Sequence, residues 1–257
     1  MNPKKRVLHN INTFSILFLS FFFLNCQVFQ KKSEGPDYFD KEFQCSESRG
    51  YPDKPEEYER YLKYWGQFKT AYDLENQKIG SAKYIIVGNS LIHLYLPDLM
   101  RASLPGVDIH NRGIAGDTTY SLLDRLQDNV LSLNPSVVFI EIGGNDLIQG
   151  KCLGFIENNI QSILALIQKN NPKTQVVFIS APPTGRKELN AIVPVYNSYL
   201  NNLAGKQKNV EFIDLYSQLR DPNSPYIQKK FSREKDTIHF NESAYQVLGN
   251  LLKKYLN

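Results

Sequence analysis

The sequence predicts an α/β protein with a mostly parallel sheet that is covered by helices on both faces. Apolar runs of strand length alternate along the chain with amphipathic helical patterns, and several of these runs end at glycine or asparagine. Such alternation is typical of parallel sheets with helices on both sides. The 257 residues, 42% of them hydrophobic and 22% charged, allow one main domain with a substantial core.

The chain begins with the parts of an export signal. Basic residues at 4–6 precede an apolar run over 14–24, and Cys26 follows this run after the single residue Asn25. The run is shorter than the roughly 20 apolar residues of a transmembrane helix. A cysteine at this place resembles the lipobox of bacterial lipoproteins, from whose commonest form Asn25 and especially Leu24 depart. We expect a signal peptide over 1–25, lipidation of Cys26 and attachment to a membrane of the bacterial cell envelope; an ordinary cleaved signal and an uncleaved signal anchor stay open.

Residues 26–55 are polar and rich in turn-forming residues, which predicts a partly disordered tether. Cys45 and Cys152 define no disulfide framework; they could pair in an oxidising compartment, but we expect both to be free. Neither cysteine has the neighbours that a metal site needs, and no metal is expected. The formal net charge of +4 includes three basic residues at 4–6, so no basic stripe predicts nucleic-acid binding.

A helical extension is predicted over residues 56–76, at the start of a body that runs from 56 to 257. Aromatic and leucine side chains recur there at helical spacing, and we expect this stripe to pack against the body rather than hold a ligand. Its members are Tyr58, Tyr61, Leu62, Trp65, Phe68 and Tyr72.

Strands and helices then alternate. Strands are predicted from short apolar runs within residues 83–88, 107–113, 136–144, 174–180 and 210–216. Helices are predicted from one-sided apolar patterns over residues 120–133, 155–170, a segment leading to 203, and 241–256. Asn134 and Pro135 are expected to end the first of these helices, Pro194 to open or kink the third, and Asn241 to cap the last.

Polar residues follow the predicted strands, where active groups gather in parallel sheets. Ser90 follows the first strand, a glycine turn over 111–119 the second, and Asn145 the third, while Asp236 and His239 lie beyond the last. This set suits acyl transfer: Ser90 as nucleophile, His239 as base and Asp236 as the group that orients the histidine. The N–H groups of Ser90 and Gly116 and the amide of Asn145 would stabilise an oxyanion.

These blocks, in this order and spacing, resemble the SGNH hydrolases, also called GDSL esterases and lipases. The resemblance runs from about residue 83 to the C-terminus, and "GIAGDTT" and "IEIGGNDL" are closest to the acetylhydrolase and lysophospholipase/thioesterase branches. It implies a three-layer α/β/α sandwich with a flavodoxin-like parallel sheet, and catalysis by Ser90, Gly116, Asn145 and His239 with Asp236 as the triad acid. Asn89 replaces the family's usual aspartate; we expect a changed local charge with activity retained. The nucleophile elbow of α/β-hydrolases fits less well, because Ile92 stands where its second glycine belongs.

We expect other polar residues to have structural roles or to lie on the surface. We expect His93 to be packed or solvent-facing, Asp117 to cap the helix after the glycine turn, and Arg112 and Arg186 to lie on the surface. The loop over 181–186 should lie at the rim of the site.

The resulting prediction is a serine esterase, independent of cofactors, that hydrolyses a small-molecule, lipid or glycan ester. The absence of a large apolar insertion favours a short acyl group such as acetyl on a sugar or a lipid. Alternatives are a lysophospholipase or thioesterase, an O-acetyltransferase, and a non-catalytic surface lipoprotein that uses the esterase fold for binding.

Overall fold

A parallel five-stranded sheet forms the centre of the computed structural model, which describes residues 35–51 and 53–256. The strand order is β2-β1-β3-β4-β5, and every neighbouring pair is parallel. The strands are β1 Tyr84–Gly88, β2 Ile109–Gly113, β3 Val137–Glu141, β4 Gln175–Ile179 and β5 Val210–Ile213. The predicted α/β class is therefore confirmed, with each strand inside or beside its expected range.

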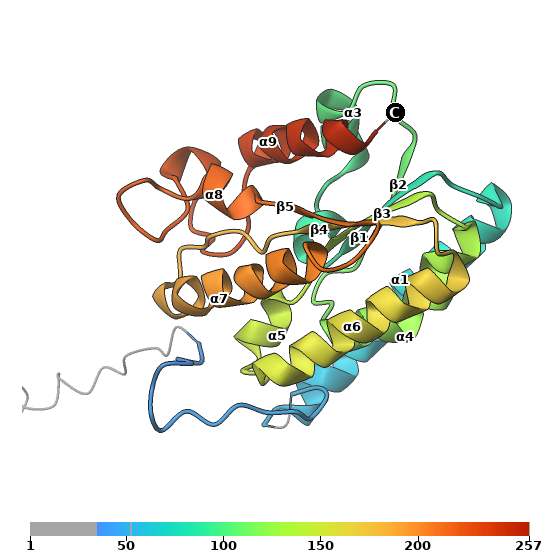
Figure 1. Cartoon of the computed structure of the whole chain (residues 1–257). Helices are drawn as coiled ribbons and strands as arrows, with labels where there is room; N and C mark the ends of the chain where they lie inside the picture. Colours follow the sequence, from blue (N-terminus) through green and yellow to red (C-terminus); the bar gives the residue numbers. More distant parts are fainter. Residues whose placement is uncertain (1–34, 52, 257) are drawn as a thin grey trace, which may run out of the picture. The chain divides into compact units, whose positions relative to one another are not determined.

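Helices cover both faces of this sheet and make three layers (Figure 1). On one side lie α4 Thr119–Asn129, α6 Leu153–Asn170 and α7 Lys187–Ala204. On the other lie the short helix α2 Ser90–His93, α3 Pro97–Ser103, α8 Leu215–Leu219 and α9 Glu242–Leu252. β1 is buried along its whole length because alternate residues face the two cores: Ile85 and Val87 point to the first group of helices, Tyr84 and Ile86 to the second.

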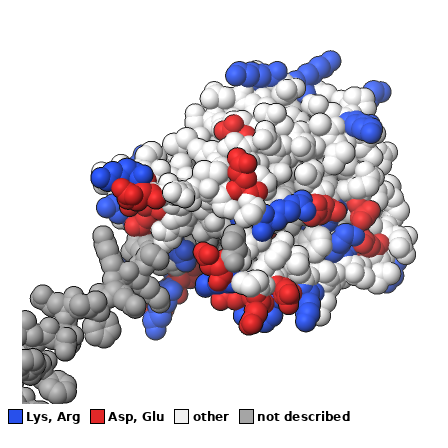
Figure 2. All heavy atoms as spheres, turned by 90° about the horizontal axis from the view of Figure 1, so that it is seen from below, with Lys and Arg blue, Asp and Glu red and all other residues white. Residues whose placement is uncertain are grey.

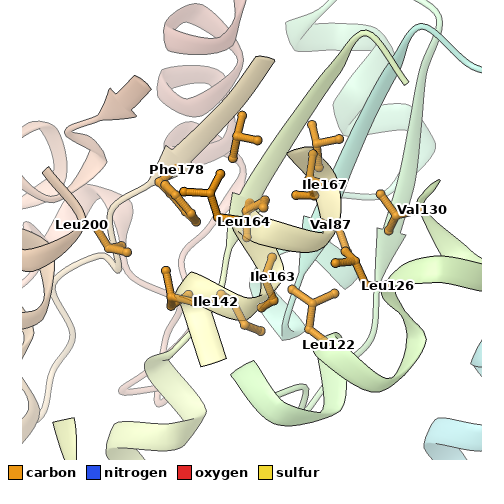
Figure 3. Packing of buried hydrophobic residues seen from close by; sticks show 14 of the residues in the cluster. Val87, Leu122, Leu126, Val130, Ile142, Ile163, Leu164, Ile167, Phe178 and Leu200 are labelled. Carbon is orange, nitrogen blue, oxygen red and sulfur yellow. The ribbon is translucent and has the colours of Figure 1, made fainter. Parts of the chain in front are cut away.

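The core beside α4 and α6 is built from branched aliphatic side chains of strands and helices. Figure 3 shows them interdigitating between the sheet and the helices. The labelled residues are Val87, Leu122, Leu126, Val130, Ile142, Ile163, Leu164, Ile167, Phe178 and Leu200. Each of them is nearly or fully buried, so the apolar faces predicted for these helices are the faces that pack.

The structure can be compared with three predictions about helices: the cap at Asn241, the end of the helix before Asn134, and the place of Pro194. Asn241 caps α9 as expected, its side chain accepting from the N–H groups of the first turn. α4 stops at Asn129, before the expected stop signal, and a 3-10 turn Leu131–Leu133 follows. Pro194 does not open α7 but lies inside it. A proline costs a helix one hydrogen bond, and here the buried side chains on both sides of Pro194 hold the helix against the sheet.

The N-terminal helix α1 Pro55–Ile79 packs on the body largely as predicted. The Trp65 ring N–H donates to Asp117 Oδ1 at 3.0 Å, and the Tyr72 hydroxyl donates to the Gly113 carbonyl at 2.7 Å. Leu62 was expected in the same stripe but is 40% exposed. Hydrogen bonds from the polar ends of Trp65 and Tyr72 therefore help to hold α1 on the body, in addition to the burial of their rings.

Residues 35–51, here called the N-terminal strap, are attached to the body rather than free of it. Cys45 and Cys152 form a disulfide, so the expectation that both are free is wrong. Beside it, the strap and the segment before α6 exchange backbone hydrogen bonds: the Ser46 N–H donates to the Gly150 carbonyl at 2.9 Å and the Cys152 N–H to the Ser46 carbonyl at 3.0 Å. Cross-linking residues 107 positions apart is worth about 4 to 5 kcal/mol in the chain-entropy account of disulfides.

A buried lysine holds the other end of the strap. Lys151 has no exposed surface, and its ammonium donates to the carbonyls of Ser48 at 2.6 Å and Gly50 at 2.9 Å. The Gly50 N–H donates in turn to the Tyr120 hydroxyl at 3.1 Å. In Figure 1 the strap runs in blue below the short helix α5 Gly144–Ile148 and past the start of α6. The part of the predicted tether that the structure describes is thus packed on the body.

The predicted signal peptide and Cys26 lie outside the described residues. Within residues 35–51 and 53–256, no helix has both the length and the apolarity to cross a membrane.

Candidate active site

Ser90, His239 and Asp236 form a continuous chain of hydrogen bonds. Ser90 is the first residue of α2, directly after β1, and His239 and Asp236 lie in the loop before α9. The His239 Nε2 atom is 2.9 Å from the Ser90 Oγ atom, and its Nδ1 atom is 2.8 Å from Asp236 Oδ2. The structure therefore brings together the three predicted residues across 149 positions of sequence, at the carboxyl edge of the sheet.

The surroundings of Asp236 keep its carboxylate ionised. Partial burial acts to raise the pKa of this carboxyl, but hydrogen bonds from the backbone N–H groups of His239 and Ile238 and from the His239 ring outweigh it and lower the pKa to about 2. The two backbone bonds, both to Oδ1, measure 3.0 and 2.9 Å. Since Oδ2 then accepts from Nδ1 of His239, Nε2 is left to accept the Ser90 proton.

The turn that presents Ser90 needs a glycine before it and a capping residue beside it. A Cβ atom on Gly88 would lie 2.0 Å from the Glu141 carbonyl oxygen, so a larger residue would push β1 and β3 apart. Asn89 is the N-cap of α2: its side-chain Oδ1 accepts from the Leu91 N–H at 2.9 Å. Asparagine therefore performs the local capping for which aspartate is also suited.

Beneath this turn lies Glu141, a buried acid that the sequence reasoning missed. It is 1% exposed, and among the described residues neither carboxyl oxygen has a hydrogen-bond partner. Burial raises its pKa to about 8, so the group is largely neutral at pH 7. An aspartate at position 89 would add a second carboxyl beside it. In the sequence, the sign of this buried acid is that Glu141 is a single charged residue inside the apolar run 137–142.

Gly116 and Asn145 are linked through Asp117, which follows Gly116 in the chain. The Asn145 side-chain N–H donates to the Asp117 carbonyl at 2.9 Å, which ties α5 Gly144–Ile148 to the turn that contains Gly116. Gly116 has φ +83°, and a Cβ there would lie 2.7 Å from the Tyr61 ring of α1. No described group accepts a hydrogen bond from the N–H of Ser90 or Gly116. The second N–H of Asn145 and these two backbone groups are the donors that the sequence assigned to an oxyanion.

Asp117 has a structural role that differs from the predicted helix cap. Thr118 caps α4, in a capping box with Ser121. Asp117 is fully buried: its Oδ2 accepts from Arg125 at 2.6 and 2.9 Å, and its Oδ1 from the Trp65 ring and from Ser121. This network supports the glycine turn from behind. In the sequence, the only sign of this network is Arg125, a basic residue on the apolar face of the predicted helix 120–133.

A small cavity opens at Ser90. It measures about 40 Å³, and its wall combines Asn89, Ser90, Glu141 and Asn145 with apolar side chains such as Ile148, Leu189 and Val193. Ala181, Pro182 and Thr184 also line it, as expected of the 181–186 loop. A larger cavity of about 460 Å³ lies behind β2 and contains no residue of the Ser90 hydrogen-bonded chain.

Three further residues singled out in the sequence, His93, Arg112 and Arg186, do not line the cavity at Ser90. His93 is packed edge-on against Phe68, as one of its two interpretations held, and its Nδ1 lies 3.1 Å from the Gly113 carbonyl. Arg112 was expected at the surface but is 1% exposed, with its guanidinium donating to Asn76 Oδ1. Arg186 lies beside the Asp236 loop, where its Nε donates to Thr237.

The parallel sheet carries a hydrogen-bonded serine, histidine and aspartate at its carboxyl edge, an arrangement that suits an α/β ester hydrolase. The model of the GDSL-like lipase/acylhydrolase family matches residues 82–247, and the chain belongs to that family. An arylesterase from Vibrio mimicus is 28% identical over 128 residues, which are 45% of this chain and 64% of the arylesterase. The chain thus spans less than two thirds of the length of the curated relatives first matched.

Solved structures agree with the fold. A protein from Streptococcus pneumonia, proposed to be a platelet activating factor, has a TM-score of 0.69 at 24% identity, covering 77% of this chain and 95% of its own. An acetylxylan esterase from Geobacillus stearothermophilus has a TM-score of 0.54 at 18% identity, covering 68% and 94%. At these identities the likeness supports the three-layer architecture, which confirms the predicted fold.

Proposed function

We propose that this protein is a carboxylic ester hydrolase that uses Ser90 as its nucleophile. The observation that carries the proposal is the hydrogen-bonded chain from Ser90 Oγ through His239 to the ionised Asp236, at the mouth of a small, mostly apolar cavity. Membership of the acylhydrolase family and similarity to an arylesterase support the same reaction class.

The reaction follows from this geometry in two steps. Ser90 Oγ attacks the ester carbonyl carbon while His239 Nε2 takes its proton; the bond from carbonyl carbon to alcohol oxygen then breaks, and His239 returns the proton to the alcohol. Water, deprotonated by His239, attacks the acyl-serine, and the acid leaves as Ser90 regains its proton. Asp236 stabilises the imidazolium that forms in each step. No metal or organic cofactor is needed for either step.

The negative charge on the carbonyl oxygen is assigned to donors from three segments. These are the N–H groups of Ser90 and Gly116 and the side-chain amide of Asn145, which the Asp117 carbonyl orients. Donors held in place before the reaction lower the barrier because they need no reorganisation as charge develops, and each contributes about 10² to 10³ in kcat.

The size of the cavity favours a short acyl group. The cavity measures only about 40 Å³ and its wall is mostly apolar, which suits a small apolar group such as the methyl of an acetyl ester better than a long alkyl chain. The acetylxylan esterase among the structural neighbours acts on an acetyl ester, which agrees with this reading.

The acyl preference is tested by hydrolysis of p-nitrophenyl esters from acetate to palmitate by the full-length chain. We expect kcat/KM to be highest for acetate and to fall at least about tenfold by octanoate, since an acyl chain too long for the cavity holds the carbonyl carbon away from Ser90. A maximum at octanoate or beyond would contradict the short-acyl proposal and favour a lipase-like enzyme.

We further propose that the protein is a lipid-anchored envelope protein attached through Cys26. The signal-like residues 1–25 support this, and the Cys45–Cys152 disulfide suits an oxidising compartment outside the cytoplasm. Mass spectrometry of the mature protein is expected to find a diacylglyceryl group on an N-terminal Cys26, and an unmodified N-terminal peptide that begins elsewhere would exclude the anchor.

A further inference from the structure

A second cavity adjoins the one at Ser90 and is walled by the N-terminal part of the chain. It measures about 380 Å³ and lies between α5 and the segment that joins the strap to α1. Asn145 and Ile148 line both cavities, so the two share a wall that includes the side chain assigned to the oxyanion. A ligand joined to the acyl group through its ester oxygen therefore has a place to lie beyond the cavity at Ser90.

The wall of this second cavity is held firmly. Lys151 fixes the carbonyls of Ser48 and Gly50 from its buried position, and the disulfide holds the strap a few residues earlier. The Tyr51 ring packs edge-on against Tyr58 of α1 with ring centres 5.5 Å apart. The wall combines two parts of the chain: Asn145, Ile148 and Gln149 lie within the family match over 82–247, whereas the other lining residues precede position 82. The part that precedes it, Gly50, Tyr51, Asp53, Lys54 and Glu57, is thus an addition to the matched family region.

The chemistry of the wall suits a ligand with many hydroxyl groups. Asp53 and Glu57 supply carboxylates, Gln149 an amide, Tyr51 an aromatic ring, and Lys54 an ammonium that lies 3.3 Å from Glu57. The face of the molecule seen in Figure 2 likewise carries acidic and basic side chains next to one another. Hydroxyl groups donate to the carboxylates and accept from the ammonium, whereas an alkyl chain would take water from these groups without offering them a hydrogen bond.

We propose that this second cavity is the subsite for the alcohol part of the ester, and that the alcohol is a carbohydrate. The inference rests on the proposed esterase function and narrows it to O-acetylated glycans. The apolar cavity at Ser90 takes the acetyl group, and the polar cavity takes the sugar, whose oxygen receives the proton from His239 when its bond to the carbonyl carbon breaks.

The test compares three acetyl esters that differ only in their alcohol: mono-O-acetylated xylotriose, an acetylated glycerophospholipid and p-nitrophenyl acetate. Acetate release is measured for the full-length chain and for Tyr51→Ala and Asp53→Ala. Lys41→Ala is the matched control, since this strap side chain is 90% exposed and lines neither cavity.

We expect the unaltered protein to favour the xylotriose ester over the lipid by at least about tenfold in kcat/KM. In Tyr51→Ala and Asp53→Ala, the ratio of kcat/KM for this ester to that for p-nitrophenyl acetate should fall about five- to tenfold, through KM, as expected when a ground-state contact is lost. The ratio should stay the same in Lys41→Ala. A preference for the lipid, or an unchanged ratio in both cavity variants, would overturn the carbohydrate subsite while leaving the esterase proposal intact.

A protein inert on all three esters would count against the esterase instead. The subsite is then measured directly by titration calorimetry with deacetylated xylotriose. We expect binding that weakens at least about fivefold in Tyr51→Ala, and no binding to the unaltered protein would refute the subsite.

Discussion

Replacing Ser90 with alanine is expected to lower kcat for p-nitrophenyl acetate by about 10⁴-fold or more. The variant keeps the oxyanion donors but has no oxygen to form the acyl-enzyme, and in serine hydrolases removal of the nucleophile costs nearly as much as removal of the whole triad. The measurement is the steady-state rate for the unaltered protein and the variant at the same concentration.

Ser162→Ala is the matched control for this experiment. Ser162 is an exposed serine on α6, and its hydroxyl donates to the Asn158 carbonyl of its own helix. We expect this variant to keep full activity, and both variants to unfold within a few degrees of the unaltered protein. Substantial ester hydrolysis by a folded Ser90→Ala protein would exclude the proposed nucleophile.

Arg125→Met is expected to produce the largest loss of stability, about 3 to 5 kcal/mol in the free energy of unfolding. Arg125 and Asp117 form an ion pair without exposed side-chain surface, so the substitution leaves a buried carboxylate without its counter-charge. Because Asp117 also holds Asn145 through its carbonyl, the folded fraction of this variant should show a lower kcat as well. Unfolding in urea measures the first effect.

Arg49→Met separates the effect of burial from that of losing any ion pair. Arg49 makes a two-pronged contact with Asp124 at 2.9 Å, but the two side chains are 50% and 46% exposed. Solvent screens such a pair, and its loss should cost less than about 1 kcal/mol. If Arg125→Met destabilises the protein no more than Arg49→Met does, the buried network does not support the site as described.

The sequence by itself determined the architecture and the meeting place of the residues proposed to react. Periodicity was sufficient for the fold because the buried strands and one-sided helices carry their patterns locally, as in β3 and α6. Ser90 and His239 could be found because parallel strands place their carboxyl ends at one edge, so residues far apart in the chain have a predictable meeting place. The helix cap at Asn241 is equally local.

Only the tertiary structure decided which polar residues are buried and which segments lie beside the site. The sequence predicts a helix cap at Asp117 and a surface position for Arg112, whereas both side chains are buried. A charged residue carries no local sign of the partner that permits its burial. The Cys45–Cys152 disulfide joins segments that no periodic pattern relates. Lys151 draws the strap against α5 through backbone carbonyls, which any sequence supplies, so the cavity beside Asn145 exists only once the chain has folded.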